Sequence, residues 1–131
     1  MKKIGVLNKD ISEVVASMGH TDMLVVGDAG LPIPPGVRRI DLAIREGLPG
    51  FLETVEAIAG ELMVERIIVA EETGSVSPHI REGLVNVFNG VQVEEVTHLV
   101  LKEICREARA VVRTGEFTPY ANVILVSGVV F

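Results

Sequence analysis

The stretch Met23-Leu24-Val25-Val26-Gly27-Asp28, residues 23–28, is the strongest indication of architecture in this sequence. Its four consecutive apolar residues lie between polar Asp22 and a Gly-Asp pair, which is typical of a strand buried on both faces of a sheet. A second strand of this kind is predicted at residues 66–70, which read Arg-Ile-Ile-Val-Ala. Strands that are apolar on both faces belong to sheets that carry helices on their faces. The two stretches therefore predict an α/β protein.

Helical and strand patterns alternate along the rest of the chain. Apolar residues recur at helical spacing in four segments, residues 11–18, 50–62, 78–88 and 99–108. Short apolar or alternating runs predict four further strands, residues 39–42, 91–96, 110–113 and 122–127. We expect loops at 29–36, which is rich in Pro and Gly, and at 71–77. Because no repeat or charge block divides the sequence, we predict a single domain over residues 1–131. Its expected fold is a three-layer α/β/α arrangement with a central, mostly parallel or mixed β-sheet.

The composition limits the kinds of ligand and the location. With 12 Lys and Arg against 18 Asp and Glu, the net charge is −6, which disfavours binding to nucleic-acid phosphates. The apolar run at the start of the chain is lost by Asn8, unlike a secretory signal, and no segment approaches the ~20 apolar residues of a membrane span. The one cysteine, Cys105, cannot form an intrachain disulfide. We therefore expect a soluble cytoplasmic protein that binds a small neutral or cationic molecule.

The chain is more hydrophobic than a small monomer requires. Hydrophobic residues make up 48% of the sequence and charged residues 23%, and the mean hydropathy is +0.42. The final run, residues 123–131, is mostly apolar and ends in Phe131, whereas free chain ends are usually polar. We therefore expect part of the apolar surface to lie between subunits of a homo-oligomer, and the C-terminal segment to be docked.

The richest chemistry lies in residues 113–122, which read Arg-Thr-Gly-Glu-Phe-Thr-Pro-Tyr-Ala-Asn and precede an apolar strand. The segment brings together a cation, a carboxylate, a phenol and an amide. A tyrosine ring offers a flat apolar plate with a hydroxyl, and an amide has separate donor and acceptor ends. Arg and Glu can brace such groups through charge-assisted hydrogen bonds. This mixture suits a small polyol such as a sugar.

Other polar residues are expected near this segment because of the sheet. Ligands of open α/β sheets bind beyond the carboxyl ends of parallel strands. Asp28 follows one predicted strand, His98 follows a second and residues 113–116 follow a third. If the last strand has begun by Tyr120, its side chain and that of Asn122 leave the same face. We therefore expect Asp28, His98, Tyr120 and Asn122 to meet at one rim.

Each of these residues also has a structural explanation that the sequence leaves open. Asp28 beside a glycine is a common turn former, His98 can occupy the first turn of a helix, and Tyr120 can anchor a hairpin. Arg113 and Glu116 are expected to form a structural pair that braces the turn.

Outside this rim, three residues have structural explanations and other site types lack support. Cys105 is spaced for packing on a helix, His79 lies on a helix surface, and His20 follows a glycine that can end a helix. The sequence has neither a phosphate-binding loop nor a dinucleotide fingerprint, and its histidines and cysteine lack metal-ligand spacing. We expect no cofactor and no bound metal.

Three segments together resemble the D-ribose pyranase family, which is related to the fucose mutarotases. They are Gly19-His20-Thr21-Asp22, Gly27-Asp28-Ala29-Gly30-Leu31-Pro32-Ile33-Pro34 and residues 113–122. The Gly-Leu-Pro-Ile-Pro run and Phe117-Thr118-Pro119 resemble the ribose branch of the family. The resemblance extends from the first residues to Phe131.

The resemblance implies an isomerase that interconverts the pyranose and furanose rings of D-ribose without a cofactor. It implies a proton donor at His20 and substrate contacts at Asp28, His98, Tyr120 and Asn122. Opening a hemiacetal ring requires removal of one proton and delivery of another, which histidine can do near neutral pH.

The resemblance also bears on partners. It implies a ring-shaped homo-oligomer, with a decamer as one size, and a place in ribose catabolism between a ribose uptake system and a ribose kinase. Two alternatives stay open: a mutarotase acting on fucose or another aldose, and a noncatalytic ribose-binding subunit.

The expected place of His20 conflicts with a site built at one rim of one chain. His20 precedes the strand at 23–26, whereas Asp28 follows it. Eight residues at about 3.3 Å each span up to roughly 26 Å, so one small sugar cannot touch both. We therefore predict that His20 of one subunit meets Asp28 of a neighbouring subunit.

Overall fold

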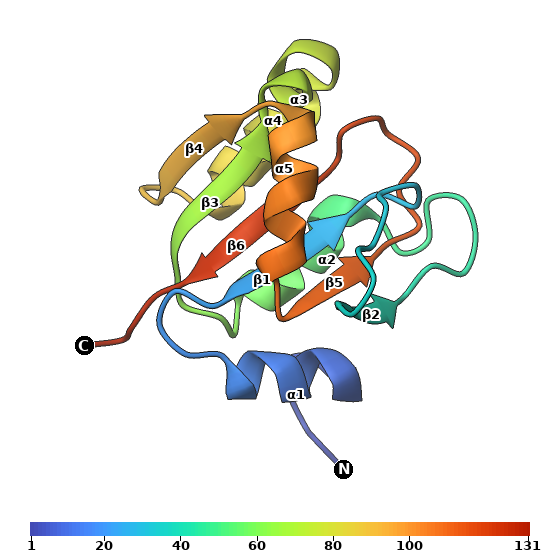
Figure 1. The fold of residues 1–131 in the computed structure, drawn as a ribbon. Helices are drawn as coiled ribbons and strands as arrows, with labels where there is room; N and C mark the ends of the chain where they lie inside the picture. Colours follow the sequence, from blue (N-terminus) through green and yellow to red (C-terminus); the bar gives the residue numbers. More distant parts are fainter.

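The computed structural model describes residues 1–131 as a six-stranded β-sheet covered by helices (Figure 1). In chain order the elements are α1 (Lys9–Ser17), β1 (Met23–Gly27), β2 (Arg38–Asp41), α2 (Phe51–Ala59), β3 (Val64–Ala70), α3 (Glu71–Val76), α4 (Pro78–Val87), β4 (Gln92–Val96), α5 (His98–Ile104), the 3₁₀ turn η1 (Cys105–Glu107), β5 (Ala110–Arg113) and β6 (Val123–Ser127). The predicted α/β class with a mixed sheet is confirmed.

The sheet has the strand order β2-β5-β1-β6-β3-β4, and five of its six strands run in one direction. Only β6 is antiparallel, and it lies between β1 and β3, where Ile124 is paired with both Val25 and Ile68. Consequently the carboxyl ends of β1 to β5 and the amino end of β6 lie along the same side of the sheet, which we call its carboxyl edge. The loops that carry the polar residues of interest lie at this carboxyl edge.

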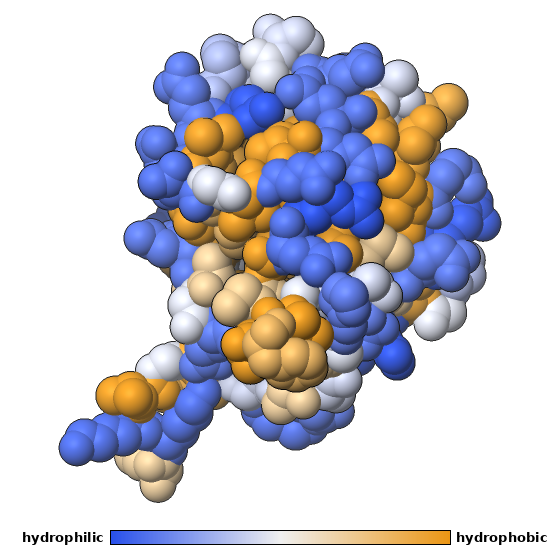
Figure 2. All heavy atoms as spheres, turned by 90° about the vertical axis from the view of Figure 1, so that its left-hand side faces the viewer, coloured by the Kyte–Doolittle hydropathy of each residue, from blue (hydrophilic) through white to orange (hydrophobic).

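The C-terminal segment, residues 128–131, leaves the opposite edge of the sheet. It does not pack on its own chain, because Val130 is 81% exposed and Phe131 is 100% exposed, and its expected docking stays a prediction about a partner subunit. Figure 2 shows the molecule from the side on which this segment lies, with hydrophobic side chains gathered among hydrophilic ones. Because Val130 and Phe131 are exposed, they are available to a partner at this end of the chain.

No helix combines the length and apolar character needed to cross a membrane.

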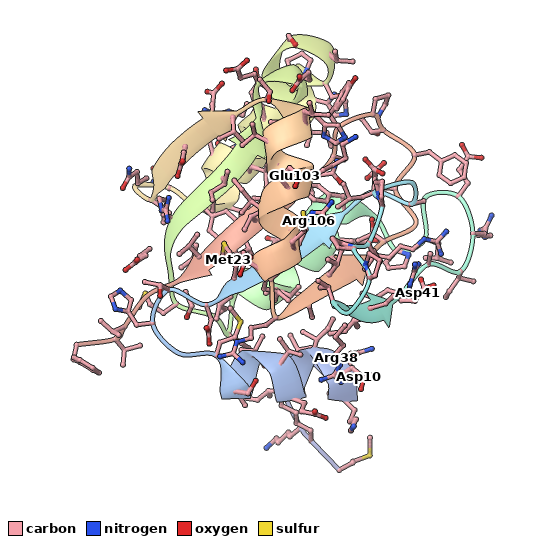
Figure 3. The ribbon with its side chains drawn as sticks, viewed as in Figure 1. Asp10, Met23, Arg38, Asp41, Glu103 and Arg106 are labelled. Atoms are coloured by element: carbon pink, nitrogen blue, oxygen red, sulfur yellow. The ribbon has the colours of Figure 1, made fainter.

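Local sequence explains where two of the helices begin. Asn8 precedes α1 and Thr97 precedes α5, and each side-chain oxygen accepts a backbone N–H of the first turn, at 2.9 and 3.2 Å. Such caps satisfy N–H groups that have no partner within a helix. Helix α1 is then tied to the sheet by an ion pair of 2.9 Å between Asp10 and Arg38 of β2 (Figure 3).

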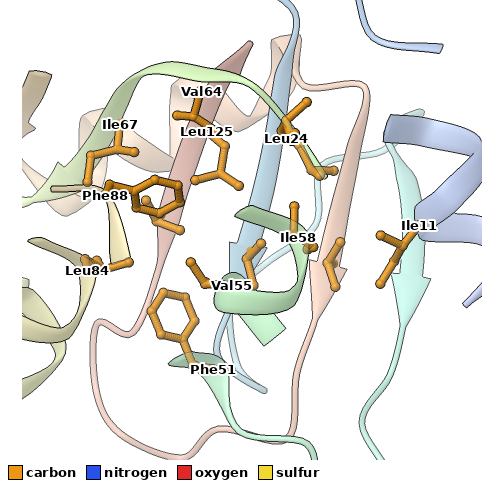
Figure 4. Packing of buried hydrophobic residues seen from close by; sticks show 14 of the residues in the cluster. Ile11, Leu24, Phe51, Val55, Ile58, Val64, Ile67, Leu84, Phe88 and Leu125 are labelled. Carbon is orange, nitrogen blue, oxygen red and sulfur yellow. The ribbon is translucent and has the colours of Figure 1, made fainter. Parts of the chain in front are cut away.

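Neighbouring strand residues contribute to two separate cores, because successive side chains of a strand point to opposite faces. Val26 belongs to a large cluster with Phe51 of α2, to which α1 and α4 also contribute (Figure 4). Val25 belongs to a smaller cluster on the other face, with Leu101 of α5 and Cys105 of η1. The three layers are therefore α1, α2 and α4, then the sheet, then α5 with η1.

The sequence-based prediction was wrong at residues 71–77, where α3 replaces the expected loop. Residues 73–75 are Thr, Gly and Ser, which have low helix propensity. Tertiary hydrogen bonds hold the segment instead, since the hydroxyls of Thr73 and Ser77 each donate to a carbonyl oxygen of residues 119–120 at 2.7 Å. The predicted helix at 99–108 also differs, because it divides into α5 and η1.

Candidate active site

The carboxyl edge of the sheet collects four of the five residues that the sequence singled out. Asp28 directly follows β1, and His98 begins α5 just after β4. Asn122 directly precedes β6, with Tyr120 two residues earlier. These loops adjoin one another because β6 begins at the edge where the other strands end. His20 lies at the other end of β1.

Asp28 and Asn122 are joined by a reciprocal pair of hydrogen bonds. Oδ1 of Asn122 accepts the backbone N–H of Asp28, and Nδ2 of Asn122 donates to Oδ2 of Asp28, each at 3.0 Å. The other carboxylate oxygen of Asp28 accepts the N–H of Gly30 at 2.9 Å. Asn122 is fully buried and Asp28 is half-buried. The bonds fix the carboxylate and use both ends of the Asn122 amide.

The rings of His98 and Tyr120 meet edge to face. Their centroids are 5.0 Å apart and their planes are inclined by 80°, a favourable arrangement for two aromatic rings. The Nδ1 atom of His98 is buried and has no hydrogen-bond partner in the chain. Since buried polar atoms almost always have a partner, this nitrogen is a candidate contact for a bound molecule.

Tyr120 has φ +61°, in the left-handed region that bulky residues rarely adopt. The condition that the last strand has begun by Tyr120 is not met, because residues 118–120 bend and turn and β6 begins at Val123, one residue after the predicted start. The carbonyl oxygen of Tyr120 accepts the hydroxyl of Thr73 at 2.7 Å and the N–H of Asn122 at 2.9 Å. A left-handed residue costs about 1–2 kcal/mol, so it persists only where its surroundings hold it.

The Asp28 carboxyl and the His98 imidazole have pKa values shifted in opposite directions. Burial raises the pKa of Asp28, and hydrogen bonds to its oxygens and the charge of His98 oppose the rise. Burial lowers the pKa of His98, and the charge of Lys102 lowers it further, whereas the carboxylates of Glu72 and Asp28 oppose this. Both shifts disfavour the charged forms and bring the two pKa values closer together. The raised pKa makes the Asp28 carboxylate a better proton acceptor than an ordinary aspartate, and the lowered pKa keeps the His98 imidazole in the neutral form, which can accept a proton at neutral pH.

His20 lies at the amino end of the sheet, away from this cluster. Its Nε2 is 2.9 Å from Oε2 of Glu65, and both side chains are partly exposed, at 54% and 41%. The next residue, Thr21, donates its backbone N–H to the carbonyl oxygen of Ser127 at 2.8 Å. His20 therefore lies beside the start of the C-terminal segment. The prediction that His20 and Asp28 lie at opposite ends of one strand is confirmed.

Arg113 and Glu116 brace the site loops separately and do not form the expected pair. The Arg113 guanidinium bonds both carboxylate oxygens of Asp41 at 3.2 Å and donates to the carbonyl oxygen of Ala29 at 3.0 Å. Glu116 accepts the backbone N–H of Phe51 at 3.1 Å, at the start of α2. The segment 113–116 is thus connected to three other parts of the chain.

Three residues that contact the cluster were missed in the sequence because they lie in the segment predicted as a loop. Oε2 of Glu72 accepts the backbone N–H of His98 at 2.8 Å. Thr73 and Ser77 bond the turn that carries Tyr120. The hydroxyl residues are four apart, the spacing of one helix face, but this is a signal only once the helix is known.

The remaining candidates have structural roles or lie outside the cluster. Cys105 is fully buried in the smaller core, where burial raises the pKa of its thiol to about 11, so its predicted packing role is confirmed. His79 is exposed on α4. No three His, Cys, Asp or Glu side chains are grouped to hold a metal ion.

The four residues of the cluster line none of the hollows on the chain surface. One hollow lies on the α5 side of the molecule, where Glu103 and Arg106 are labelled in Figure 3. It is lined by Pro32, Ile33, Pro34, Pro35, Leu99, Lys102, Glu103 and Arg106. Sites for small molecules are usually concave and enclose most of the ligand. A single chain therefore supplies the polar groups of a site without all of its walls.

The chain matches known proteins along its whole length. It is 62% identical to a D-ribose pyranase from Chloroflexus aggregans and 59% identical to one from Symbiobacterium thermophilum, with 100% of each chain covered. The structure of Bacillus subtilis RbsD complexed with D-ribose matches with a TM-score of 0.97 and 45% identity, again over 100% of both chains.

A fucose mutarotase from Streptococcus pneumoniae, solved in complex with L-fucose, is more distant. Its TM-score is 0.81 at 24% identity, over 95% of each chain, which is a likeness of fold alone. A model of the RbsD / FucU transport protein family matches residues 1–130. Together with the full-length identities, this match shows that the chain belongs to the RbsD / FucU transport protein family.

Proposed function

We propose that this protein is a D-ribose pyranase, an isomerase that interconverts the pyranose and furanose forms of D-ribose, with residues 1–131 acting as one domain. The observation that carries the proposal is the cluster at the carboxyl edge, where Asp28 and His98 have oppositely shifted pKa values beside the Tyr120 ring. The full-length identity to two D-ribose pyranases supports ribose as the sugar.

The reaction is acid–base chemistry that side chains can perform. Opening the ring removes the proton of the anomeric hydroxyl, breaks the bond between the anomeric carbon and the ring oxygen, and protonates that oxygen. Addition of the other hydroxyl to the aldehyde then closes the second ring. We assign the anomeric proton to Asp28 or His98, and the proton for the ring oxygen to His20. Positioned groups of this kind contribute roughly 10²- to 10⁴-fold each in rate.

Two of the cluster residues have binding roles in this scheme. Tyr120 is half-buried, and its ring lies beside His98, where it offers an apolar plate with a hydroxyl to the sugar. Asn122 is fully buried and bonded to Asp28 at both ends of its amide. We propose that Asn122 serves the substrate by orienting the Asp28 carboxylate.

We further propose that the complete site forms between two copies of the chain in a ring-shaped homo-oligomer, with a decamer as one size. Two observations support this. The cluster lines no hollow of its own chain, and His20 lies at the opposite end of β1, near the start of the C-terminal segment in which Val130 and Phe131 are exposed. When Val130 and Phe131 of one copy are buried against a second copy, His20 of the first copy can reach the Asp28 cluster of the second. The apolar contact supplies affinity and the shared site explains why both ends of the strand carry functional groups.

Saturation-transfer NMR on equilibrated D-ribose tests the activity directly. We expect the protein to accelerate exchange between pyranose and furanose anomeric protons, and His20→Ala to abolish this, whereas His79→Ala on exposed α4 leaves it unchanged. Unaltered exchange with His20→Ala would remove the proposed donor. A mixture of His20→Ala and Asp28→Ala subunits is expected to recover activity, because some interfaces then contain both intact residues. No recovery after demonstrated subunit exchange would contradict the shared site.

A panel of sugars separates the proposal from its rivals. A mutarotase for fucose or another aldose would accelerate anomer exchange of that sugar and leave D-ribose unaffected. A noncatalytic subunit would bind D-ribose without accelerating its exchange.

We propose the cytoplasm as the location of the protein. The single cysteine, Cys105, is buried and cannot form an intrachain disulfide, which is compatible with a reducing compartment.

A further inference from the structure

Helix α3 is bonded to the backbone of both residues whose rings meet in the candidate site. Oε2 of Glu72 accepts the N–H of His98 at 2.8 Å. The next residue, Thr73, donates its hydroxyl to the carbonyl oxygen of Tyr120 at 2.7 Å. Four residues later, Ser77 donates to the carbonyl oxygen of Pro119 at 2.7 Å. One short helix thus fixes the start of α5 and the turn that precedes β6.

The bond from Thr73 is not part of ordinary helix packing. A buried threonine in a helix commonly bonds the carbonyl oxygen four residues earlier, as Thr54 of α2 does with Gly50 at 2.7 Å. Thr73 reaches out of its helix instead, and its side chain is 0% exposed, so water does not compete for the bond. Its acceptor belongs to Tyr120, the cluster residue with φ +61°. The hydroxyl therefore holds a strained carbonyl in place.

We infer that Thr73 is a positioning residue for the ring-exchange reaction, acting through Tyr120, an inference that rests on the proposed function. Without this hydroxyl, the Tyr120 carbonyl keeps only the N–H of Asn122, and the residue is free to relax toward an ordinary backbone conformation. Its ring then moves relative to His98, whose backbone stays bonded to the same helix through Glu72. The 5.0 Å contact between the rings would be lost.

The test compares Thr73→Val, which has nearly the same shape without the hydroxyl, with Thr73→Ser, which keeps the hydroxyl. Thr54→Val is the matched control, because Thr54 is also a buried helical threonine and the variant removes a hydroxyl-to-carbonyl bond that does not involve residues 119–122. Two quantities are measured: the nuclear Overhauser contact between the His98 and Tyr120 rings without ligand, and kcat/KM for ribose ring exchange. We expect Thr73→Val to lose the ring contact and about tenfold in kcat/KM, equivalent to about 1.4 kcal/mol. We expect Thr73→Ser to stay within about twofold of the unmodified protein.

Each outcome separates positioning from general stability. Thr73→Val with the ring contact and the activity intact would overturn the inference, as would equal losses in Thr73→Val and Thr54→Val. If the unmodified protein does not accelerate ribose exchange, the proposed function fails, and the ring contact alone decides whether Thr73 positions Tyr120. Loss of that contact in Thr73→Val, with recovery in Thr73→Ser, would then support the positioning.

Discussion

Asn122 holds Asp28 by two hydrogen bonds of 3.0 Å across 94 residues of sequence: the Asp28 backbone N–H donates to the amide oxygen, and the amide nitrogen donates to the Asp28 carboxylate. The two bonds determine the orientation of the amide, because its oxygen must face the N–H and its nitrogen must face the carboxylate. They also join the end of β1 to the start of β6, which pair along their length. The antiparallel strand in the middle of the sheet therefore places an amide where the candidate acid needs a partner.

Replacing this amide should destabilise the fold. Asn122→Ala leaves the Asp28 N–H and one carboxylate oxygen without partners in a buried place, so we expect the free energy of unfolding to fall by about 2 kcal/mol. Urea denaturation measures the change. Asn86→Ala, on the exposed side of α4, is the control and should change the unfolding free energy by less than about 0.5 kcal/mol. Equal effects of the two variants would show that the Asn122 bonds contribute no net stability.

The two aspartates that flank β1, Asp22 and Asp28, should have different pKa values. Hydrogen bonding to the Gly19 N–H and to Arg109 lowers the pKa of Asp22, whereas burial raises the pKa of Asp28. In a ¹³C NMR titration of the carboxyl carbons, we therefore expect Asp28 to take up its proton first as the pH falls and Asp22 to follow at lower pH. The reverse order would contradict the assigned burial of Asp28.

The same shifts have opposite consequences for stability. Asp22 contributes stability above the ordinary aspartate pKa, and this is lost as the pH falls through its lowered value in the folded state. Asp28 binds its proton more tightly when folded, so its contribution is present at acid pH and is lost as the pH rises through its raised value. At neutral pH the ionised, half-buried Asp28 carboxylate thus lowers the free energy of unfolding.

A charge on α3 and a charge on α5, the helix that His98 begins, should shift the pKa of His98 in opposite directions. The carboxylate of Glu72 raises the pKa of His98 and the ammonium of Lys102 lowers it, while burial is the largest influence and also lowers it. We expect Glu72→Gln, which keeps an acceptor for the His98 N–H, to lower the pKa of His98 further, and Lys102→Gln to raise it. Long-range ¹H–¹⁵N NMR of the imidazole follows both variants. Glu82→Gln on exposed α4 should leave the His98 titration unchanged, and a shift there equal to that of Glu72→Gln would contradict a local effect.

The sign of the stability effect follows from the lowered pKa of His98. Between that value and the ordinary histidine value near 6.5, the unfolded chain binds more protons than the folded one. Stability therefore rises with pH through this window and falls on acidification.

The sequence was informative where local pattern and tertiary structure agree. The apolar run at 23–26 predicted β1 because a strand that is buried on both faces can hardly be polar. It was uninformative at α3, because Thr73 in this helix and Ser77 just after it are held by bonds to a turn more than 40 residues away. Local propensity cannot report such bonds. Asp28 and His98 could be predicted as neighbours because each follows a predicted strand. The two Asn122 bonds join residues 94 positions apart and could not be predicted from local pattern.

Gly115 allows the loop that leads to Tyr120 to pack closely against the loop at residues 45–49. A Cβ atom at Gly115 would lie 2.5 Å from the backbone oxygens of both Arg45 and Leu48, where no flexible side chain can yield. The Gly115 N–H also donates to the carbonyl oxygen of Pro49 at 2.8 Å, so the two loops must separate to admit a methyl group. We expect Gly115→Ala to lower the free energy of unfolding by about 3 kcal/mol.

Thermal and urea unfolding of Gly115→Ala test this expectation against Gly19→Ala, in which the nearest atom to the added Cβ would be Oδ2 of Asp22 at 3.8 Å. The control should lose less than about 1 kcal/mol. Because residues 113–118 lead directly to Tyr120, separation of the loops should also disturb the contact of that ring with His98. Equal stability of the two alanine variants would mean that the loops are free to move apart, and would remove the close approach at Gly115 as a determinant of the site.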